Sequence, residues 1–412
     1  MKTASYTETL PRLLYFSDVP VASTFHGSAL VHRLLEDHPP ERLLVMETKP
    51  LRAAPERRLR GVRYREFPMS GNRWRYTRAQ RWAGSWMLLQ VARHARNLSR
   101  SLEGFAPEAV LTVASEYSWL VAARFAETAN LPLHLILHDD WPPSMPVLRG
   151  LRARQELLFG GVYRRARSRL CVSPFMEQEY REKYGVAGQV LYPSWAKNTS
   201  SFDRTVRAYD DHRGPLVGAY AGNIFRGGYA RQIAGLAERL AARGGHLLLF
   251  GPQSPQRLQF WGLDRKNVLP QGLVSSQELI SRLRAEADFV LVPMSFESGD
   301  DERNMRISFP SKLTDYTAAG LPILIWGPDY CSAARWARRY APVAEIVTSQ
   351  AVEDVEAALR RLEQAQHRER LGRAAREVGD KLFSHRAAME IFQGALLRGG
   401  ETENNERSYR EA

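Results

Sequence analysis

The chain has 412 residues, of which 44% are hydrophobic and 25% are charged, a composition typical of globular proteins. A single hydrophobic core rarely grows beyond about 250–300 residues, so we expect at least two domains. No apolar run reaches the roughly 18 residues that span a bilayer, and the first residues contain no hydrophobic signal core. These features argue against a membrane-spanning or exported protein and predict a cytoplasmic one.

The net charge of +13 is concentrated in one segment. Residues 57–100 contain twelve arginines and a single acidic residue, Glu66. Such a local excess predicts an anionic partner, which is a membrane surface, a nucleic acid or an acidic substrate.

Short apolar runs alternate along the chain with longer segments of helical periodicity, which is typical of βα units built on parallel sheets. Helices are expected at 229–242, 277–285 and 352–365. Five strands are expected in each half of the chain, at 13–16, 43–46, 109–113, 133–137 and 170–172, and at 216–220, 247–250, 289–292, 323–325 and 344–347.

A polar stretch separates these two sets of strands. We therefore predict an α/β chain with two Rossmann-like domains, at residues 1–200 and 215–398, joined by a linker at 201–214 and followed by a disordered tail at 399–412. Ligands bind beyond the carboxyl ends of the strands in doubly wound sheets, so a cleft between the domains is expected.

A glycine-rich turn follows the first strand of the second half, at residues 219–228. Gly222 and its neighbours permit close approach of a ligand to the backbone, and the free amides of the next helix suit an anion. Arg226 adds a forked set of donors matched to phosphate oxygens. The alternative is an ordinary strand-to-helix turn in which the glycines serve only the geometry.

A second segment, at 308–325, has the marks of a helix opened by Pro310 and ended by Gly320. Lys312 lies in the first turn, where the helix dipole disfavours a cation unless it faces a bound anion. Asp315 lies three residues on, on the same helix face, where its carboxylate suits ribose hydroxyls. The alternative is a solvated Lys/Asp pair.

The stretch FPSKLTDYTAAGLPILIWGP at 309–328 resembles the donor-site segment of family 4 and related GT-B glycosyltransferases. In that family PSK, a carboxylate four residues after the serine, and a GxP turn occur together. The neighbouring segments YAGNI, HLLLFGP, NVLPQGLVSSQEL and ADFVLVP follow the same order, as do LHLILHDD and LCVSPFMEQEYREKYG in the first half. The resemblance covers residues 13–342, most of the chain.

The resemblance implies a GT-B architecture and a hexosyltransferase that uses a nucleotide-sugar donor, retains the anomeric configuration and needs no metal or other cofactor. The acceptor would be a glycan or a lipid-linked molecule in cell-envelope or extracellular polysaccharide synthesis. The residues assigned to the donor are Gly222, Asn223 and Arg226 beside the diphosphate, Ser311 and Lys312 on its phosphates, Asp315 on the ribose, and Gly251 and Leu273 near the base. Gly27 would begin the first helix and let the amides of that helix approach the donor.

Two departures leave the donor sugar open. The family usually has glutamate where Asp315 stands, and its partner glutamate falls on Ile307, whose side chain cannot replace it. Contacts to the sugar would then come from another residue, such as Glu297 or Asn304.

In the first half, His138, Asp139 and Asp140 end a predicted strand and so open toward the expected cleft. His138 either hydrogen-bonds the sugar or takes the acceptor proton, unless it is a structural histidine. Glu116, after another strand, is a candidate acceptor contact and would be the base of an inverting reaction.

A metal site is not expected. Asp139 with Asp140, or Asp300 with Asp301, would suit a divalent cation, but two similar α/β halves fit the metal-independent plan better. Cys171 and Cys331 lack metal-binding spacing, and Cys171 lies in an apolar run typical of a buried, inert thiol.

Residues 78–100 have the pattern of a helix with two unlike faces. Met87, Val91 and Leu98 form a core stripe, while Trp82, Trp86 and Leu89 lie nearly opposite, together with Arg78, Arg93, Arg96 and Arg100. Trp and Leu among arginines suggest an interfacial helix on anionic lipid, the alternative being a packed second face. No nucleic-acid-binding motif accompanies it.

Two alternatives to a transferase stay open. One is a GT-B-type epimerase or phosphorylase, although the extra acid/base carboxylates of an epimerase are not evident. The other is a non-catalytic basic protein that binds membranes or nucleic acids and does not bind nucleotides.

Overall fold

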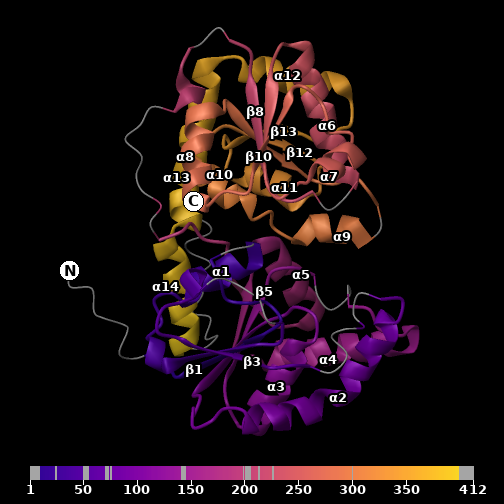
Figure 1. Cartoon of the computed structure of the whole chain (residues 1–412), viewed down its shortest axis with the longest axis vertical. Helices are drawn as coiled ribbons and strands as arrows, with labels where there is room; N and C mark the ends of the chain where they lie inside the picture. The colour runs from indigo at the N-terminus through magenta and orange to yellow at the C-terminus, as the bar shows by residue number, and fades with distance from the viewer. Residues whose placement is uncertain are drawn as a thin grey trace, which may run out of the picture. The chain divides into compact units, whose positions relative to one another are not determined.

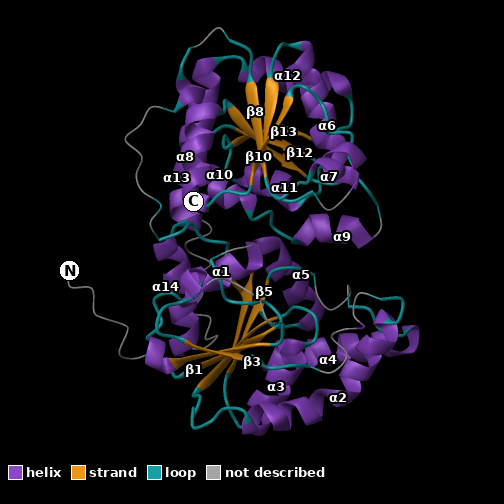
Figure 2. Ribbon diagram, viewed as in Figure 1, coloured by secondary structure: helices purple, strands orange, loops and turns teal. Residues whose placement is uncertain are grey.

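The computed structural model describes residues 10–23, 26–49, 55–69, 74, 77–140, 145–197, 199, 206–211, 214–224, 227–298 and 300–398. Its elements form two compact units (Figure 1). The first unit comprises Met1–Tyr192 with Ala388–Ala412, and the second comprises Pro193–Ala387. Each unit has a parallel sheet covered by helices on both faces (Figure 2), which is the arrangement that apolar strands and amphipathic helices of alternating order favour.

The first unit has a seven-stranded sheet in the order β3-β2-β1-β4-β5-β6-β7. Its strands are β1 (Leu13–Ser17), β2 (Leu43–Glu47), β3 (Arg63–Glu66), β4 (Ala109–Val113), β5 (Leu133–Leu137), β6 (Ser168–Cys171) and β7 (Gln189–Val190). Its helices are α1 (His26–Leu35), α2 (Gln80–Arg100), α3 (Ser118–Thr128), α4 (Arg152–Arg165), α5 (Pro174–Tyr184) and α14 (His385–Arg398).

The second unit has a six-stranded sheet in the order β10-β9-β8-β11-β12-β13. Its strands are β8 (Val217–Ala221), β9 (His246–Phe250), β10 (Val268–Gly272), β11 (Phe289–Pro293), β12 (Ile323–Trp326) and β13 (Ala344–Val347). Its helices are α6 (Gly227–Ala242), α7 (Pro255–Phe260), α8 (Ser276–Glu286), α9 (Asp300–Ile307), α10 (Lys312–Ala319), α11 (Ser332–Arg339), α12 (Val352–Leu362) and α13 (Ala365–Phe383).

Each sheet changes its direction of winding once, and this places a ligand-binding position in each unit. The chain runs from β1 to β2 on one side and then returns to β4 on the other, and β8 is placed in the same way between β9 and β11. Open α/β sheets bind ligands beyond the carboxyl ends of the strands at such a switch point. In the second unit this point is the end of β8, where Gly222 follows.

All ten predicted strands are present. Three further strands, β3, β7 and β10, were not predicted, and all three lie at the edges of their sheets. An edge strand is covered on fewer sides, so it needs no continuous apolar run. β3 has the sequence RYRE with two exposed residues, and β10 includes Pro270 and exposed positions. Periodicity and apolar runs therefore identified only the covered strands and one edge, β13.

The unit boundaries differ from the expected ones on both sides of the second unit. Residues 193–197 were expected in the first domain but belong to the second unit. Residues 388–398 were expected in the second domain, but α14 buries Met389, Phe392 and Leu396 in the core of the first unit. Residues 206–211 of the expected linker belong to the second unit, where buried Arg368 donates to the carbonyls of Ala208 and Asp210 at 2.7 and 2.9 Å. The rest of that linker, except Gly214, and the predicted tail at 399–412 lie outside the described residues.

Cys171 and Cys331 are both free and fully buried, as expected for Cys171. Among the described residues no group of three or more His, Cys, Asp or Glu side chains is placed to hold a metal ion. In the same residues no helix has the length and apolar character needed to cross a bilayer.

Candidate functional site

The Gly222 turn and the first turn of α10 lie side by side in the second unit, although about ninety residues separate them in the sequence. A Cβ atom built on Gly222 would lie 3.4 Å from Cε of Lys312. The ammonium of Lys312 lies 5.3 Å from the ring centroid of Tyr220, the residue two before Gly222. The two segments that the sequence analysis singled out therefore form one site.

Hydrogen bonds fix the backbone of the Gly222 turn. The amide of Gly222 donates to Phe250 O at 2.9 Å, and the Gln253 side chain donates to Gly222 O at 2.6 Å. The hydroxyl of buried Tyr220 donates to Asn223 O at 3.0 Å. The turn is thus held in shape by hydrogen bonds within its own unit.

Gly251, at the end of β9, packs directly against this turn. Its φ is +149°, and a Cβ there would lie 2.4 Å from Gly222 O. Its amide donates to Gly272 O at 2.8 Å, which brings Leu273, 64% exposed, to the same edge of the sheet. The ends of β8, β9 and β10 therefore carry three of the predicted donor residues close together.

Replacing Gly251 by alanine should displace the Gly222 turn. The Cβ–O contact is far below van der Waals distance, and a φ of +149° strains any residue with a Cβ, so the variant should lose about 1–3 kcal/mol of unfolding free energy. Affinity for a nucleoside diphosphate, the ligand expected at this turn, should fall at least tenfold by calorimetry, about 1.4 kcal/mol. Gly262→Ala is the control, because Gly262 also has positive φ but open space around its Cβ position. Equal affinities of both variants for the diphosphate would contradict this account.

The helix α10 is tied to the turn by a residue that the sequence analysis missed. The amide of Ala221 donates to the hydroxyl of Tyr316 at 2.8 Å, and Tyr316 is fully buried, so burial raises the pKa of its hydroxyl. Tyr316 lies four residues after Lys312, on the same side of the helix, and this spacing is the only signal that the sequence offered for it.

Lys312 is a partly buried cation that pairs with no carboxylate among the described residues. Burial alone lowers the pKa of its ammonium to about 8. A buried charge that lacks a counter-charge is costly, and such groups are typical of sites that bind the opposite charge. Ser311 holds the N-cap position of α10, yet its hydroxyl makes no capping hydrogen bond. The first turn of α10 is therefore open to an anion.

The other predicted donor-site residues are placed as follows. Asp315 is half-buried in the first turns of α10, and Asn223 has a buried side-chain oxygen with no hydrogen-bond partner in the described residues. Arg226 lies outside the described residues. Ile307 is buried, as an apolar residue at that position requires.

The two residues named as substitutes for the missing glutamate both have partners in the second unit. Glu297 pairs with Arg231 near the start of α6, where a Cβ on Gly228 would lie 3.5 Å from Cδ of Glu297. Asn304 lies in α9 and accepts a hydrogen bond from Ser308. Glu297 is thus beside the helix that follows the Gly222 turn.

In the first unit, Glu116 follows β4 with a φ of +45°, a left-handed conformation that is rare outside glycine and asparagine. Its carboxylate forms an ion pair with Lys49, which follows β2. Strained residues of this kind cluster at functional sites, and this one lies at the switch point of the first sheet. Gly27, in the first turn of α1, has only Val19 within 4 Å of a built Cβ, so packing alone does not require a glycine there.

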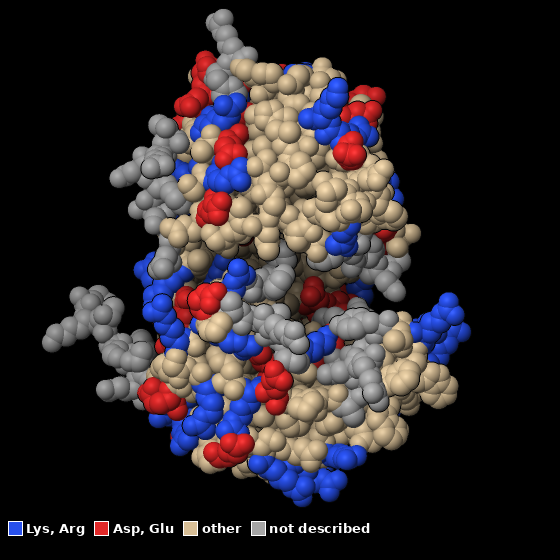
Figure 3. Space-filling model, in the orientation of Figure 1, with Lys and Arg blue, Asp and Glu red and all other residues tan. Residues whose placement is uncertain are grey.

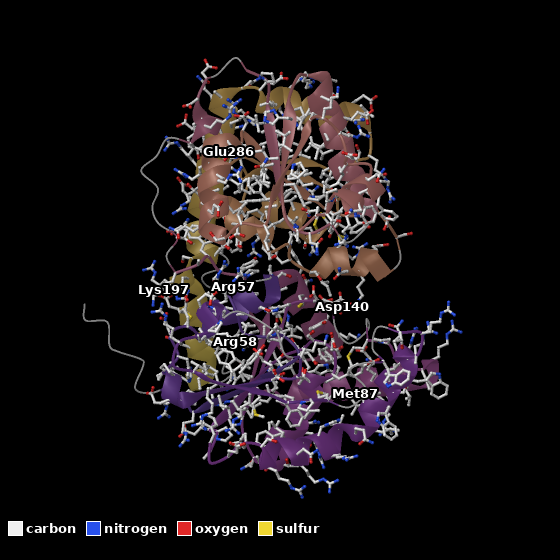
Figure 4. The ribbon with its side chains drawn as sticks, viewed as in Figure 1. Arg57, Arg58, Met87, Asp140, Lys197 and Glu286 are labelled. Carbon is white, nitrogen blue, oxygen red and sulfur yellow. The ribbon has the colours of Figure 1, made fainter. Side chains whose placement is uncertain are left out.

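The three residues that follow β5 differ in their environment. His138 is partly buried, and burial lowers the pKa of its imidazole to about 4, so it is neutral at pH 7. Asp139 is exposed. Asp140, labelled in Figure 4, is buried and accepts a hydrogen bond from Tyr180 at 2.9 Å, which makes it a structural residue.

Asp18 is the residue of the first unit that sequence reasoning missed. It follows β1, is 4% exposed, and accepts hydrogen bonds from the amides of Tyr117 and Ser118 at 3.0 and 2.8 Å and from the hydroxyl of Thr48. It thereby caps the N-terminus of α3, whose own N-cap residue makes no side-chain hydrogen bond. Its position after a strand was the only available signal.

Solved structures similar to this chain identify the class of its fold. HepE of Anabaena in complex with UDP matches with a TM-score of 0.66 and 13% identity, covering 93% of this chain and 99% of HepE. Sucrose-phosphate synthase of Thermosynechococcus elongatus has a TM-score of 0.62 and 15% identity, over 92% and 97% of the two chains. The lipopolysaccharide outer core galactosyltransferase WaaB, in its apo form, has a TM-score of 0.59 and 15% identity, over 93% and 98%. The chain therefore has the GT-B fold of glycosyltransferases.

A family model agrees with this class. Residues 45–193 match the model described as Glycosyltransferase Family 4. A comparison with curated protein sequences finds no match. The predicted resemblance to family 4 is therefore confirmed by a family model over residues 45–193, and the similar solved structures confirm the predicted GT-B fold with two Rossmann-like domains.

Proposed function

We propose that the protein is a glycosyltransferase that takes a hexose from a nucleotide diphosphate donor bound at the Gly222 turn and the first turn of α10. The observation that carries this proposal is Lys312, a partly buried cation with a pKa lowered by burial, placed beside a glycine turn. A diphosphate provides the missing negative charge, and glycine amides and a helix N-terminus bind phosphate oxygens. HepE, of the same fold, has been solved with UDP and with UDP-glucose, so a UDP-sugar is the first donor to test.

In this proposal each part of the site has one task. The Gly222 turn, Ser311 and Lys312 hold the two phosphates, and Asp315 accepts hydrogen bonds from the ribose hydroxyls. Gly251 and Leu273 border the base. Lys312 also stabilises the diphosphate as it leaves, because negative charge grows on that group when the bond to the anomeric carbon breaks.

We propose further that the reaction retains the anomeric configuration and needs no metal. An inverting reaction requires an enzymic base, and the two candidates suit that task poorly. The carboxylate of Glu116 is held by Lys49, and an imidazole with a pKa of about 4 is a weak base at neutral pH. The departing diphosphate, held by Lys312, would instead take the proton of the acceptor hydroxyl as that oxygen bonds to the anomeric carbon.

The acceptor in this proposal is a glycan or a lipid-linked sugar of cell-envelope or extracellular polysaccharide synthesis, met at the cytoplasmic face of the membrane. WaaB, a lipopolysaccharide outer core galactosyltransferase of the same fold, supports an acceptor of this class.

Calorimetry with UDP and GDP tests the donor site. We expect UDP to bind, and Asp315→Ala to weaken binding about tenfold or more, since a hydrogen bond to a charged group contributes about 1.5–3 kcal/mol. Asp264→Ala is the matched control, because Asp264 is an exposed carboxylate of the same unit. The site is wrong if the parent binds neither nucleotide, or if Asp315→Ala binds as tightly as the control. Turnover of several UDP-sugars with lipid-linked acceptors then identifies the sugar and the anomeric outcome.

A further inference from the structure

Exposed tryptophans are concentrated in one short segment of the first unit. Among the described residues the only exposed tryptophans are Trp74, Trp82 and Trp86, with 51%, 68% and 52% of their surface accessible. Leu89, one helical turn beyond Trp86, is 65% exposed. Large apolar side chains gathered on a surface mark an interaction site, because a soluble protein otherwise buries them.

The last three of these residues lie on one face of α2. Successive helical residues are about 100° apart, so Trp82, Trp86 and Leu89 fall in one row along the helix. The opposite face is packed, with Met87 1% and Leu98 0% exposed; Met87 is labelled in Figure 4. The hydroxyl of Ser85 accepts from the Leu148 amide at 3.1 Å, and this bond anchors the helix to the rest of the unit. The orientation of α2 is therefore fixed, with the tryptophan row facing outward.

The same row continues as a line of arginines. Arg93, Arg96 and Arg100 occupy the C-terminal half of the exposed face, and α2 contains no acidic residue. Within the described residues these three guanidinium groups form no ion pair, whereas Arg58 and Arg65 of the same basic segment pair with Glu47 and Glu103. Figure 3 shows Lys and Arg side chains gathered at several places on the visible face of the first unit. These three arginines of the basic segment thus lie on the face of α2 that carries the exposed tryptophans.

A membrane surface with anionic lipids suits both the tryptophan half and the arginine half of this face. Tryptophan prefers the boundary between headgroups and acyl chains, and arginine pairs with lipid phosphates. A helix of 21 residues is about 30 Å long, long enough to place both halves on a flat surface at once. Single-stranded nucleic acid would also use arginine and tryptophan, but Leu89 offers no ring on which a base stacks.

We propose that α2 is an interfacial helix that docks the protein on membranes containing anionic lipids. Trp82, Trp86 and Leu89 enter the headgroup boundary, and Arg93, Arg96 and Arg100 contact lipid phosphates. This docking does not depend on nucleotide binding in the second unit. It keeps the enzyme at the surface where a lipid-linked acceptor is found.

Vesicle co-sedimentation of the full chain tests the proposal, with vesicles of phosphatidylcholine alone and of phosphatidylcholine with phosphatidylglycerol. The parent should bind the anionic vesicles, and binding should weaken as salt rises. Replacing Arg93, Arg96 and Arg100 by glutamine should lower the partition coefficient about 100-fold, since each basic residue near an anionic surface contributes about fivefold. The double variant Trp82→Gln/Trp86→Gln should lose at least tenfold.

Two control variants match these changes on the second unit. Arg257→Gln/Lys266→Gln/Arg360→Gln removes the same charge from exposed positions, and Phe260→Gln removes an aromatic ring that is 77% exposed. Both should bind anionic vesicles within about twofold of the parent, and all variants should bind UDP equally, which separates this test from that of the donor site.

Three results would overturn the proposal. The first is equal binding of the parent to neutral and anionic vesicles, and the second is an arginine variant that binds vesicles as tightly as its charge-matched control. The third is a parent that binds no vesicles but binds a single-stranded oligonucleotide through the same three arginines. The last result would assign the face to nucleic acid.

Discussion

Lys312→Met will bind UDP at least about 30-fold more weakly than the parent and will be more stable than the parent without ligand. The first effect follows from the loss of the cation that faces the diphosphate, since breaking a desolvated charge pair costs about 2–5 kcal/mol. The second follows from the lowered pKa, because folding places the ammonium where its charge is poorly solvated. We expect a gain of about 1–3 kcal/mol in unfolding free energy at pH 7, seen as a higher Tm.

The same pKa predicts how both effects depend on pH. The pKa of Lys312 is about 8 in the folded protein and 10.5 when unperturbed, so between these values the unfolded chain binds more protons than the folded one. The stability advantage of Lys312→Met should be complete below pH 8 and vanish as pH rises to about 10.5. UDP affinity of the parent should fall from pH 7 to pH 9 as the ammonium loses its proton, and the variant should lack this fall.

Thermal unfolding and calorimetry measure these two quantities, and Lys266→Met is the control. Lys266 is an exposed lysine of the same unit, so its replacement should change neither Tm nor UDP affinity. Lys312 would be an ordinary surface lysine if Lys312→Met matched this control in both measurements. A variant that lost stability together with affinity would show that Lys312 is a structural residue instead.

Asp18→Ala will lower the stability of the first unit by about 3 kcal/mol. The change leaves the buried amides of Tyr117 and Ser118 and the hydroxyl of Thr48 without their acceptor, and each unpaired buried donor costs about 1–3 kcal/mol, less whatever a water molecule recovers. Because Asp18 holds the start of α3, the left-handed backbone of Glu116 should relax as well. Hydrogen exchange of the α3 amides measures the loss of protection directly.

Asp18→Asn is the conservative counterpart of that change. Its amide oxygen can still accept from the two backbone amides, and its NH₂ group can donate to Thr48, so only the charge at the helix N-terminus is lost, at about 1 kcal/mol. Exchange in α10, in the second unit, should be the same in both variants and the parent. Equal protection of α3 in Asp18→Ala and the parent would show that Asp18 is not the cap.

Much of the fold could be predicted because its signals are local. Apolar runs such as 109–113 and 133–137 coincide with β4 and β5, because covered strands of a parallel sheet must be apolar along their whole length. The edge strand β3 and the helix α14 escaped prediction for the opposite reason. β3 has exposed positions, and α14 is assigned to the first unit by the packing of Phe392 at the far end of the sequence.

The sequence by itself determined the α/β class, the two sets of strands, and the two segments around Gly222 and Lys312, because apolar periodicity, glycine turns and helix starts are properties of neighbouring residues. Only the tertiary structure decided that these segments touch, that Tyr316 ties them together through Ala221, and that Asp18 caps a helix one hundred residues away. Contacts of that separation depend on strand order, which no local pattern specifies. The same holds for charge: the pKa of Lys312 is lowered by burial, and burial exists only after the chain has folded.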